Sequence, residues 1–151
     1  MSLVRRITIW LVASVGLSLA CVVPATAETA GRPFTVDLTG EAEVNAAGVP
    51  NQGDLDGSGT ASLTINPGTR EVCWTIEVTG VAPITAAHIH VAPSTAPGQI
   101  VVHLNSTSGC TEVSRRLALA IITDPSSYYV NVHNLEFPTG ALRGQLAFAP
   151  N

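Results

Sequence analysis

The residues with the clearest capacity for chemistry are the four histidines, His88, His90, His103 and His133, all of which lie in segments that read as β-strands. Histidine is the commonest ligand of transition metals apart from the thiolates. One residue separates His88 from His90, so in a strand they share a face with Cα atoms ~6.6 Å apart. Both imidazoles could then reach one ion at ~2.0 to 2.1 Å.

The direction of the histidine side chains follows from their apolar neighbours. Ile89 and Val91 alternate with His88 and His90, and since the two apolar residues belong in the core, the histidine pair should point outward. Tyr129, Asn131 and His133 likewise alternate with Val130 and Val132, which we expect in the core.

His103 alternates with Val102 and Leu104 and could join the same outer face. Three or four imidazoles on neighbouring strands would suit copper or zinc. If the ring nitrogens of His88, His90 and His133 lie ~3 to 4 Å apart, metal binding becomes the leading hypothesis.

The competing interpretation makes the histidines structural. Each would donate to a backbone carbonyl or bond to Asn131 or Asn134, and no carboxylate lies within two residues of the His88/His90 pair to orient a metal-bound imidazole. We favour this interpretation from the sequence. The alternative is a copper- or zinc-binding domain that uses His88, His90 and His133 and could be redox-active, and the cofactor is otherwise unknown.

No other group of residues predicts catalysis. The chain has no Gly-x-Ser-x-Gly elbow and no phosphate-binding loop before a helix. Glu41 and Glu43 share a face of the first expected strand, which is typical of a solvated face. Asp54 and Asp56 lie in a polar stretch over 45–57 that reads as a surface loop without the pattern of a calcium site. We therefore predict no catalytic residue, and the sequence favours a protein that is not an enzyme.

Arg143 is the remaining candidate. Leu142 and Leu146 should face the core with Gly144 between them, whereas Arg143 and Gln145 should face outward. Arg143 could bind an anion above the histidine face, or act as a structural clamp on Glu136 or on a carbonyl. The structural role is the favoured one.

The elements that must position these residues are short strands. Apolar residues recur with period 2 between clusters of Gly, Pro, Asn and Asp, a pattern that predicts an all-β, Greek-key, immunoglobulin-like β-sandwich. Strands are expected near 33–44, 58–66, 70–79, 85–92, 99–104, 115–122, 128–134 and 141–148, although 115–122 could also turn as a helix. The core should contain Trp74, Ile76, Ile89, Val91, Val130, Val132, Leu142 and Leu146.

Composition and the N-terminal sequence limit the number of domains, the kind of partner and the location of the protein. The 151 residues make one domain, and 7 Arg against 11 acidic residues exclude the basic stripe that binds nucleic acid. Residues 1–27 read as a signal peptide cleaved after Ala27, followed by a short segment over 28–32 and the domain over 33–148. The alternatives are a membrane anchor and a lipoprotein acylated at Cys21. We expect a secreted or extracytoplasmic protein (periplasm or cell exterior) without a stable membrane anchor after cleavage.

Two cysteines, Cys73 and Cys110, follow the signal peptide. In a compartment that permits disulfides, an even count predicts a Cys73–Cys110 bridge. Unpaired cysteines are the alternative.

The ordered motifs resemble a known family. They are Leu38-x-Gly40-x-x-Glu43-Val44, Gly57-Ser58-Gly59-Thr60-Ala61, Ala87-His88-Ile89-His90, Gly98, Leu104, Tyr129-Val130-Asn131-Val132-His133 and Phe137-Pro138-x-Gly140-x-x-Arg143-Gly144-Gln145-Leu146. From Phe34 to Leu146 the chain is similar to the chordin-type (CHRD) domains of secreted bacterial proteins.

This resemblance implies an immunoglobulin-like sandwich with a more distant similarity to copper/zinc superoxide dismutase. It implies no settled molecular function; a non-catalytic binding or structural module, with an extracellular protein as partner, is what it suggests. The dismutase similarity would place copper ligands at His88, His90 and His133 and an anion-guiding arginine at Arg143. Between His90 and Cys110 only His103 occurs, so the bridging histidine and zinc cluster of dismutases have no counterpart.

Overall fold

The computed structural model describes residues 31–81 and 83–148, so the predictions of a signal peptide over 1–27 and an acylated Cys21 lie outside the described residues. The described chain forms eight β-strands, one α-helix and one turn of 3-10 helix. In chain order these are β1 (Arg32–Thr39), β2 (Ser58–Asn66), β3 (Glu71–Thr79), β4 (Ala86–Val91), β5 (Gln99–His103), β6 (Ser108–Glu112), α1 (Arg115–Thr123), η1 (Pro125–Ser127), β7 (Tyr128–His133) and β8 (Leu142–Gln145).

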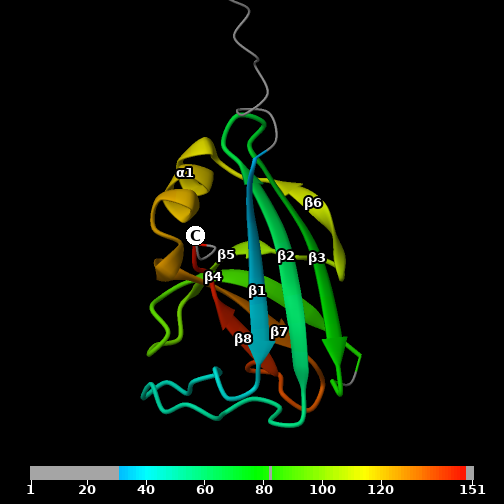
Figure 1. Cartoon of the computed structure of the whole chain (residues 1–151). Helices are drawn as coiled ribbons and strands as arrows, with labels where there is room; N and C mark the ends of the chain where they lie inside the picture. Colours follow the sequence, from blue (N-terminus) through cyan, green and yellow to red (C-terminus); the bar gives the residue numbers. More distant parts are fainter. Residues whose placement is uncertain (1–30, 82, 149–151) are drawn as a thin grey trace, which may run out of the picture.

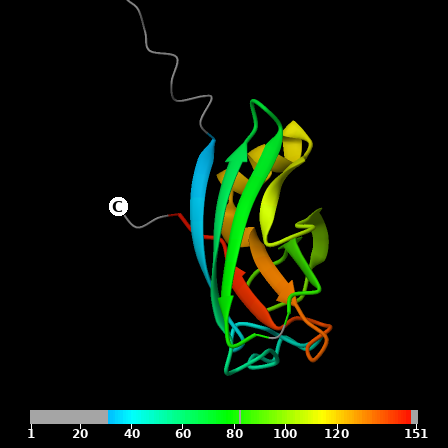
Figure 2. The same cartoon turned by 90° about the vertical axis from the view of Figure 1, so that its right-hand side faces the viewer.

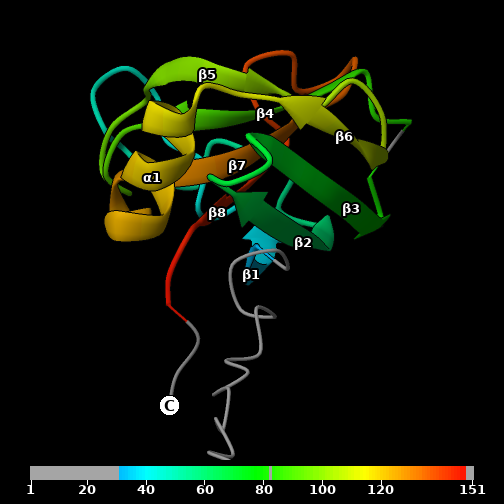
Figure 3. The same ribbon diagram turned by 90° about the horizontal axis from the view of Figure 1, so that it is seen from above.

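The strands form one curled antiparallel sheet in the order β5-β4-β7-β8-β1-β2-β3-β6. Its two halves meet between β8 and β1, where the register contains a single pair, Thr39 and Arg143. Figures 1 and 3 show that the sheet folds over at this joint, so that β1, β2 and β3 form one layer and β4, β5, β7 and β8 form the other. The predicted all-β, sandwich- or barrel-like class is confirmed.

The core lies between the two layers and follows the alternation of the strands. Seven of the eight predicted core residues are buried, namely Trp74, Ile76, Ile89, Val130, Val132, Leu142 and Leu146. Val91 is the exception: it is the last residue of β4 and is 38% exposed. Alternation assigns a residue to a face of the sheet, but it does not show how far along the strand the facing layer extends.

The segment 115–122 is a helix, so the strand prediction there is wrong. The hydroxyl of Ser114 caps α1 by accepting a hydrogen bond from the backbone N–H of Leu117. Ala118 and Ile121, three residues apart, are fully buried, whereas Leu119 is 40% exposed. A helical period therefore places the apolar residues better than the alternation suggested by Leu117, Leu119 and Ile121. The helix lies across one end of the sandwich (Figure 2).

The end of β1 and the presence of β6 also differ from expectation. β1 ends at Thr39, and residues 40–57 run as a long irregular segment before β2. β6, an edge strand beside β3, was not predicted because Ser108–Glu112 has no apolar alternation and no buried residue. A strand exposed on both faces leaves no hydrophobic pattern in its sequence.

The predicted disulfide is present and fastens this edge strand. Cys73 of β3 and Cys110 of β6 are direct cross-strand partners and are covalently bonded. The indole N–H of Trp74 also donates to the carbonyl oxygen of Ser106, 2.8 Å away, just before β6. Within 31–81 and 83–148, no helix has the length and apolar character required to cross a membrane.

Candidate functional site

The outer face of β4, β7 and β8 is polar, and two loops cover it. The first, residues 40–57, is held to the sheet by the backbone N–H of Asp54, which donates to the carbonyl of Ala141 at 2.8 Å. The second, residues 92–98, passes so close to the first that a side chain on Gly48 would collide with the carbonyl of Thr95. A polar layer is therefore enclosed between the sheet and the loops.

Arg143 lies in this layer and is only 1% exposed. The prediction that it faces away from the core is right in direction, but the loops bury it. Its Nη2 donates to the carbonyl oxygens of Pro93 at 2.9 Å and Ala96 at 3.1 Å. The guanidinium carbon lies 3.5 Å from the centre of the Tyr129 ring. The side chain thus ties the 92–98 loop to β8.

Glu43 is buried as well, at 5% exposure, and the expected solvated pair with Glu41 does not exist. Only Glu41 is exposed, because the chain leaves β1 at Thr39 and turns Glu43 inward. Oε2 of Glu43 accepts a hydrogen bond from the amide of Asn131. Burial raises the pKa of Glu43, against the lowering effect of the Val44 N–H and of Arg143.

Gly140 makes room for this carboxylate. Its φ is 145°, and a side chain there would lie 2.3 Å from Oε2 of Glu43. Glycine is therefore required at position 140 both by the backbone conformation and by the close approach of Glu43.

The four histidines gather on the same face, beside this layer. His88 is the centre of the group: its ring lies 5.0 Å from His103, 5.0 Å from His133 and 5.5 Å from His90, measured between ring centres. One ring nitrogen from each of His88, His90 and His133 lies within 4.8 Å of the other two. These three residues are called the histidine triad below.

Backbone carbonyls fix the tautomers of two triad members. Nδ1 of His90 lies 2.9 Å from the carbonyl oxygen of Gly98, and Nδ1 of His133 lies 3.1 Å from that of Pro138. A carbonyl oxygen only accepts, so both Nδ1 atoms carry the proton and both Nε2 atoms present a lone pair. Metal-binding imidazoles are oriented by this kind of bond, so the carbonyl contacts are compatible with a metal role.

Ring nitrogens of the triad approach one another. Nδ1 of His88 lies 3.1 Å from Nε2 of His133, within the 3 to 4 Å expected of two nitrogens on one metal ion. Nε2 of His90 is buried and has no hydrogen-bond partner among the described residues. Buried polar atoms without a partner are rare in proteins. Among the four in the described residues, the others being Asn134 Nδ2, Arg143 Nη1 and Gln145 Oε1, Nε2 of His90 is the one imidazole nitrogen.

All three triad imidazoles favour the neutral form. Burial lowers the pKa of His88 to about 4, helped by His133, His90 and His103. Burial also lowers the pKa of His90 and of His133, against the raising effect of their carbonyl bonds. Neutral imidazole is the form that binds metals, so protons do not compete for the lone pairs at neutral pH.

Tyr129 holds His90 in place. The two rings stack with their centres 4.8 Å apart and 6° between their planes. The Tyr129 hydroxyl accepts a hydrogen bond from the backbone N–H of Gly98 at 3.0 Å, and the carbonyl of that same glycine binds His90. The sequence placed Tyr129 and Asn131 on the face of His133, but alternation carries no signal for the loops that turn this face into an enclosed layer.

His103 stands outside the triad. It lies on the edge strand β5 directly opposite His88, with its ring edge-on to that of His88, and its side chain is exposed. Beyond this pair the register of β4 and β5 shifts at a β-bulge between Ile89 and His90. Because of the bulge, His90 pairs with Ile100 rather than with Val101, the partner that a regular register would give it.

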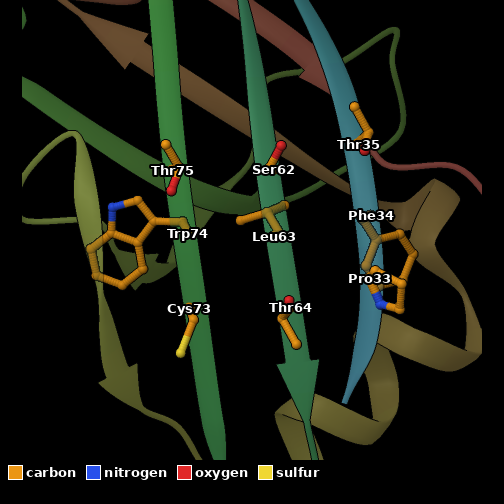
Figure 4. Close-up of a pocket in the computed structure, with 9 residues that line it drawn as sticks. All are labelled: Pro33, Phe34, Thr35, Ser62, Leu63, Thr64, Cys73, Trp74 and Thr75. Carbon is orange, nitrogen blue, oxygen red and sulfur yellow. The ribbon is translucent and has the colours of Figure 1, made fainter. Parts of the chain in front are cut away.

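The layer formed by β1, β2 and β3 has a different surface. An open hollow of about 280 Å³ lies on it (Figure 4) and has no ionisable side chain in its lining, because its one cysteine, Cys73, is disulfide-bonded. Its lining consists of Pro33, Phe34, Thr35, Ser62, Leu63, Thr64, Cys73, Trp74 and Thr75. It offers no group for acid–base or metal chemistry.

Comparison with known proteins identifies one family. The family model described as the CHRD domain matches residues 34–146, which is most of the chain and spans all eight strands apart from the first residues of β1. No curated protein and no solved structure matches the chain significantly. The similarity to copper/zinc superoxide dismutase stays a prediction. On the family match, the chain belongs to the CHRD domain family.

Proposed function

We propose that this CHRD domain binds one copper ion outside the cytoplasm, through Nδ1 of His88 and Nε2 of His90 and His133. The observation that carries the proposal is the buried, unpaired Nε2 of His90. The carbonyl of Gly98 orients that lone pair, and the stacked ring of Tyr129 fixes its plane. A hydrogen-bonding role alone would leave this atom without a partner.

The spacing and protonation of the triad support the same proposal. The His88 and His133 nitrogens lie at a separation suited to one ion, and the ligand nitrogens of all three residues lie within 4.8 Å of one another. The widest pair must shorten for all three to bind the same ion. In the metal-free protein Nδ1 of His88 donates to Nε2 of His133. To bind a metal ion through Nδ1, His88 would carry its proton on Nε2 instead. All three imidazoles of the triad would then stay neutral.

The donor set favours copper over zinc. Three imidazoles suit both metals, and divalent copper binds a given nitrogen site more tightly than zinc does. The triad contains no carboxylate and no thiolate, so all three ligands are neutral nitrogens and the general affinity order of the divalent metals decides between copper and zinc.

An extracytoplasmic location is supported by the disulfide and by the N-terminal sequence. Cys73 and Cys110 are bonded, and such bonds persist in oxidising compartments. Residues 1–27 have the charged start, apolar run and Ala-x-Ala end of a signal peptide. We infer that export precedes metal binding.

The alternative is a non-catalytic binding module in which the histidines are clamps. The bonds from His90 to Gly98 and from His133 to Pro138 favour it, since each fixes a loop to the sheet. An extracellular protein would then be the partner. The two proposals differ in whether the triad takes up metal.

Titration of the metal-free, oxidised protein with Cu(II) and Zn(II), with elemental analysis, tests the proposal. The wild type and the control Gln99→Ala, exposed on β5, should bind one copper per chain and prefer it to zinc. The double variant His88→Ala/His90→Ala should bind at least ~100-fold more weakly, since even loss of an orienting partner costs 10–100-fold. Equal, weak uptake by the wild type and a folded double variant would contradict copper binding and favour the clamp role.

A further inference from the structure

His103 is the one histidine that the triad does not use, yet it shares a face with it. It pairs with His88 across β4 and β5, and the two ring centres are 5.0 Å apart with 84° between the planes. His88 therefore touches both the triad and His103. Within the described chain, the histidines form a continuous row from a solvent-exposed ring to the buried ring of His90.

Exposure falls along this row. His103 is exposed, His88 and His133 are half-buried, and His90 is 8% exposed. β5 is the last strand of the sheet, so no further strand lies beyond His103. The loops that bury Arg143 and His90 hold the opposite side through Pro93, Ala96 and Gly98. Access to the triad is therefore open on the side of His103.

We propose that His103 is an entry ligand, which binds a copper ion at the edge of the sheet and passes it to the triad through His88. This inference rests on the proposed copper site and adds the route by which that site fills and empties.

The transfer is a ligand exchange. The arriving ion first bonds to a ring nitrogen of His103 and to His88, in place of weak ligands from its donor. Bonds to His133 and His90 then form as the bond to His103 breaks. The oxidation state of the ion does not change, and His103 is released when its bond to the ion breaks.

This role separates rate from affinity. A group that binds the ion only during passage lowers the barrier in both directions, so its loss slows loading and release equally and leaves the dissociation constant unchanged. A static fourth ligand would behave differently: its loss would weaken binding mainly through faster release.

Stopped-flow measurements test the proposal with Cu(II) loaded from its glycine complex and removed by EDTA. His103→Phe keeps an aromatic ring against His88 but has no lone pair, and His103→Ala removes the ring as well. Both variants should load and release copper about tenfold more slowly than the wild type, with an equilibrium affinity within about threefold. Gln99→Ala, on the same edge strand, should match the wild type.

Each other outcome overturns the proposal and identifies what replaces it. Wild-type rates in His103→Phe and His103→Ala would show that copper does not pass His103. A lower affinity with faster release would make His103 a permanent fourth ligand. Slow exchange in His103→Ala but not in His103→Phe would show that only the ring contact matters. A wild type that binds no copper at equilibrium would refute the copper site itself, which the titration detects before any rate is measured.

Discussion

The two layers of the sandwich share one core but differ in what their outer faces carry. On β1, β2 and β3 the outward positions hold mainly Thr, Ser and acidic side chains that remain exposed, such as Thr35, Ser62, Thr75 and Glu77. On β4, β7 and β8 the corresponding face carries His90, Tyr129, Asn131 and Arg143, which loops bury. Each layer already has a core on its inner face. The second, polar layer on β4, β7 and β8 is therefore held by hydrogen bonds and charge rather than by apolar packing, as the contacts of Arg143 show.

The sharpest test of this contrast is removal of the buried cation. Arg143→Ala removes the donor to the buried Pro93 and Ala96 carbonyls and the cation near Glu43, so we expect a loss of about 2 to 4 kcal/mol in the free energy of unfolding. Thr75→Ala, on the exposed face, should change it by less than about 0.5 kcal/mol. Urea unfolding of both variants measures the difference, and equal losses would erase the distinction between the layers.

The disulfide tests the other layer. Cys73→Ser/Cys110→Ser should lower the free energy of unfolding by about 3 to 4 kcal/mol, because the bond closes a long loop with a sequence separation of 37. The copper affinity should stay at the wild-type value, because both cysteines lie in the β1-β2-β3-β6 half of the sheet. Urea unfolding and copper titration of the same sample separate the two effects. A parallel loss of affinity would mean that the halves do not act independently.

Tyr129→Phe probes the orientation of His90. The phenylalanine keeps the stacked ring but loses the acceptor for the Gly98 N–H, so the carbonyl that orients His90 is held less firmly. We expect copper affinity to fall about tenfold, which is the lower end of the 10–100-fold range seen when a residue that orients a metal ligand is lost. A competition titration measures this value. Unchanged affinity in the folded variant would assign Tyr129 to stacking alone.

The last test of the buried face concerns pH. Burial and the neighbouring imidazoles hold the pKa of His88 at about 4, below its ordinary value of 6.5. Between these values the unfolded chain binds a proton at His88 and the folded chain does not, so the metal-free protein should become less stable as pH falls from 6.5 to 4. NMR should show His88 neutral until about pH 4, and titration near 6.5 would contradict the buried site.

The core residues could be predicted because strands that pack on a core alternate apolar and polar residues. Alternation placed Ile89, Val130 and Val132 in the core and the histidines on the opposite face. It failed at α1, where the apolar residues of Leu117–Ile121 fit two periods and the Ser114 cap decides between them. It also had nothing to detect in β6, which is exposed throughout.

The outer polar layer was not predictable for a different reason. A residue that faces away from one core reads as exposed, so Glu43 and Arg143 were expected at the surface. Their burial depends on loops 40–57 and 92–98, whose path is set by tertiary contacts such as Asp54 to Ala141 and Arg143 to Pro93. The sequence named the histidines and their face but not the enclosure beside them.

The central claim is that the buried lone pair of His90 is a copper ligand, and pulsed EPR of the protein loaded with one equivalent of Cu(II) tests it most directly. The remote ring nitrogens of bound imidazoles modulate the signal, and we predict three of them in the wild type and two in His90→Ala, with Gln99→Ala identical to the wild type. A spectrum without imidazole nitrogens, or one that His90→Ala leaves unchanged, would contradict the account.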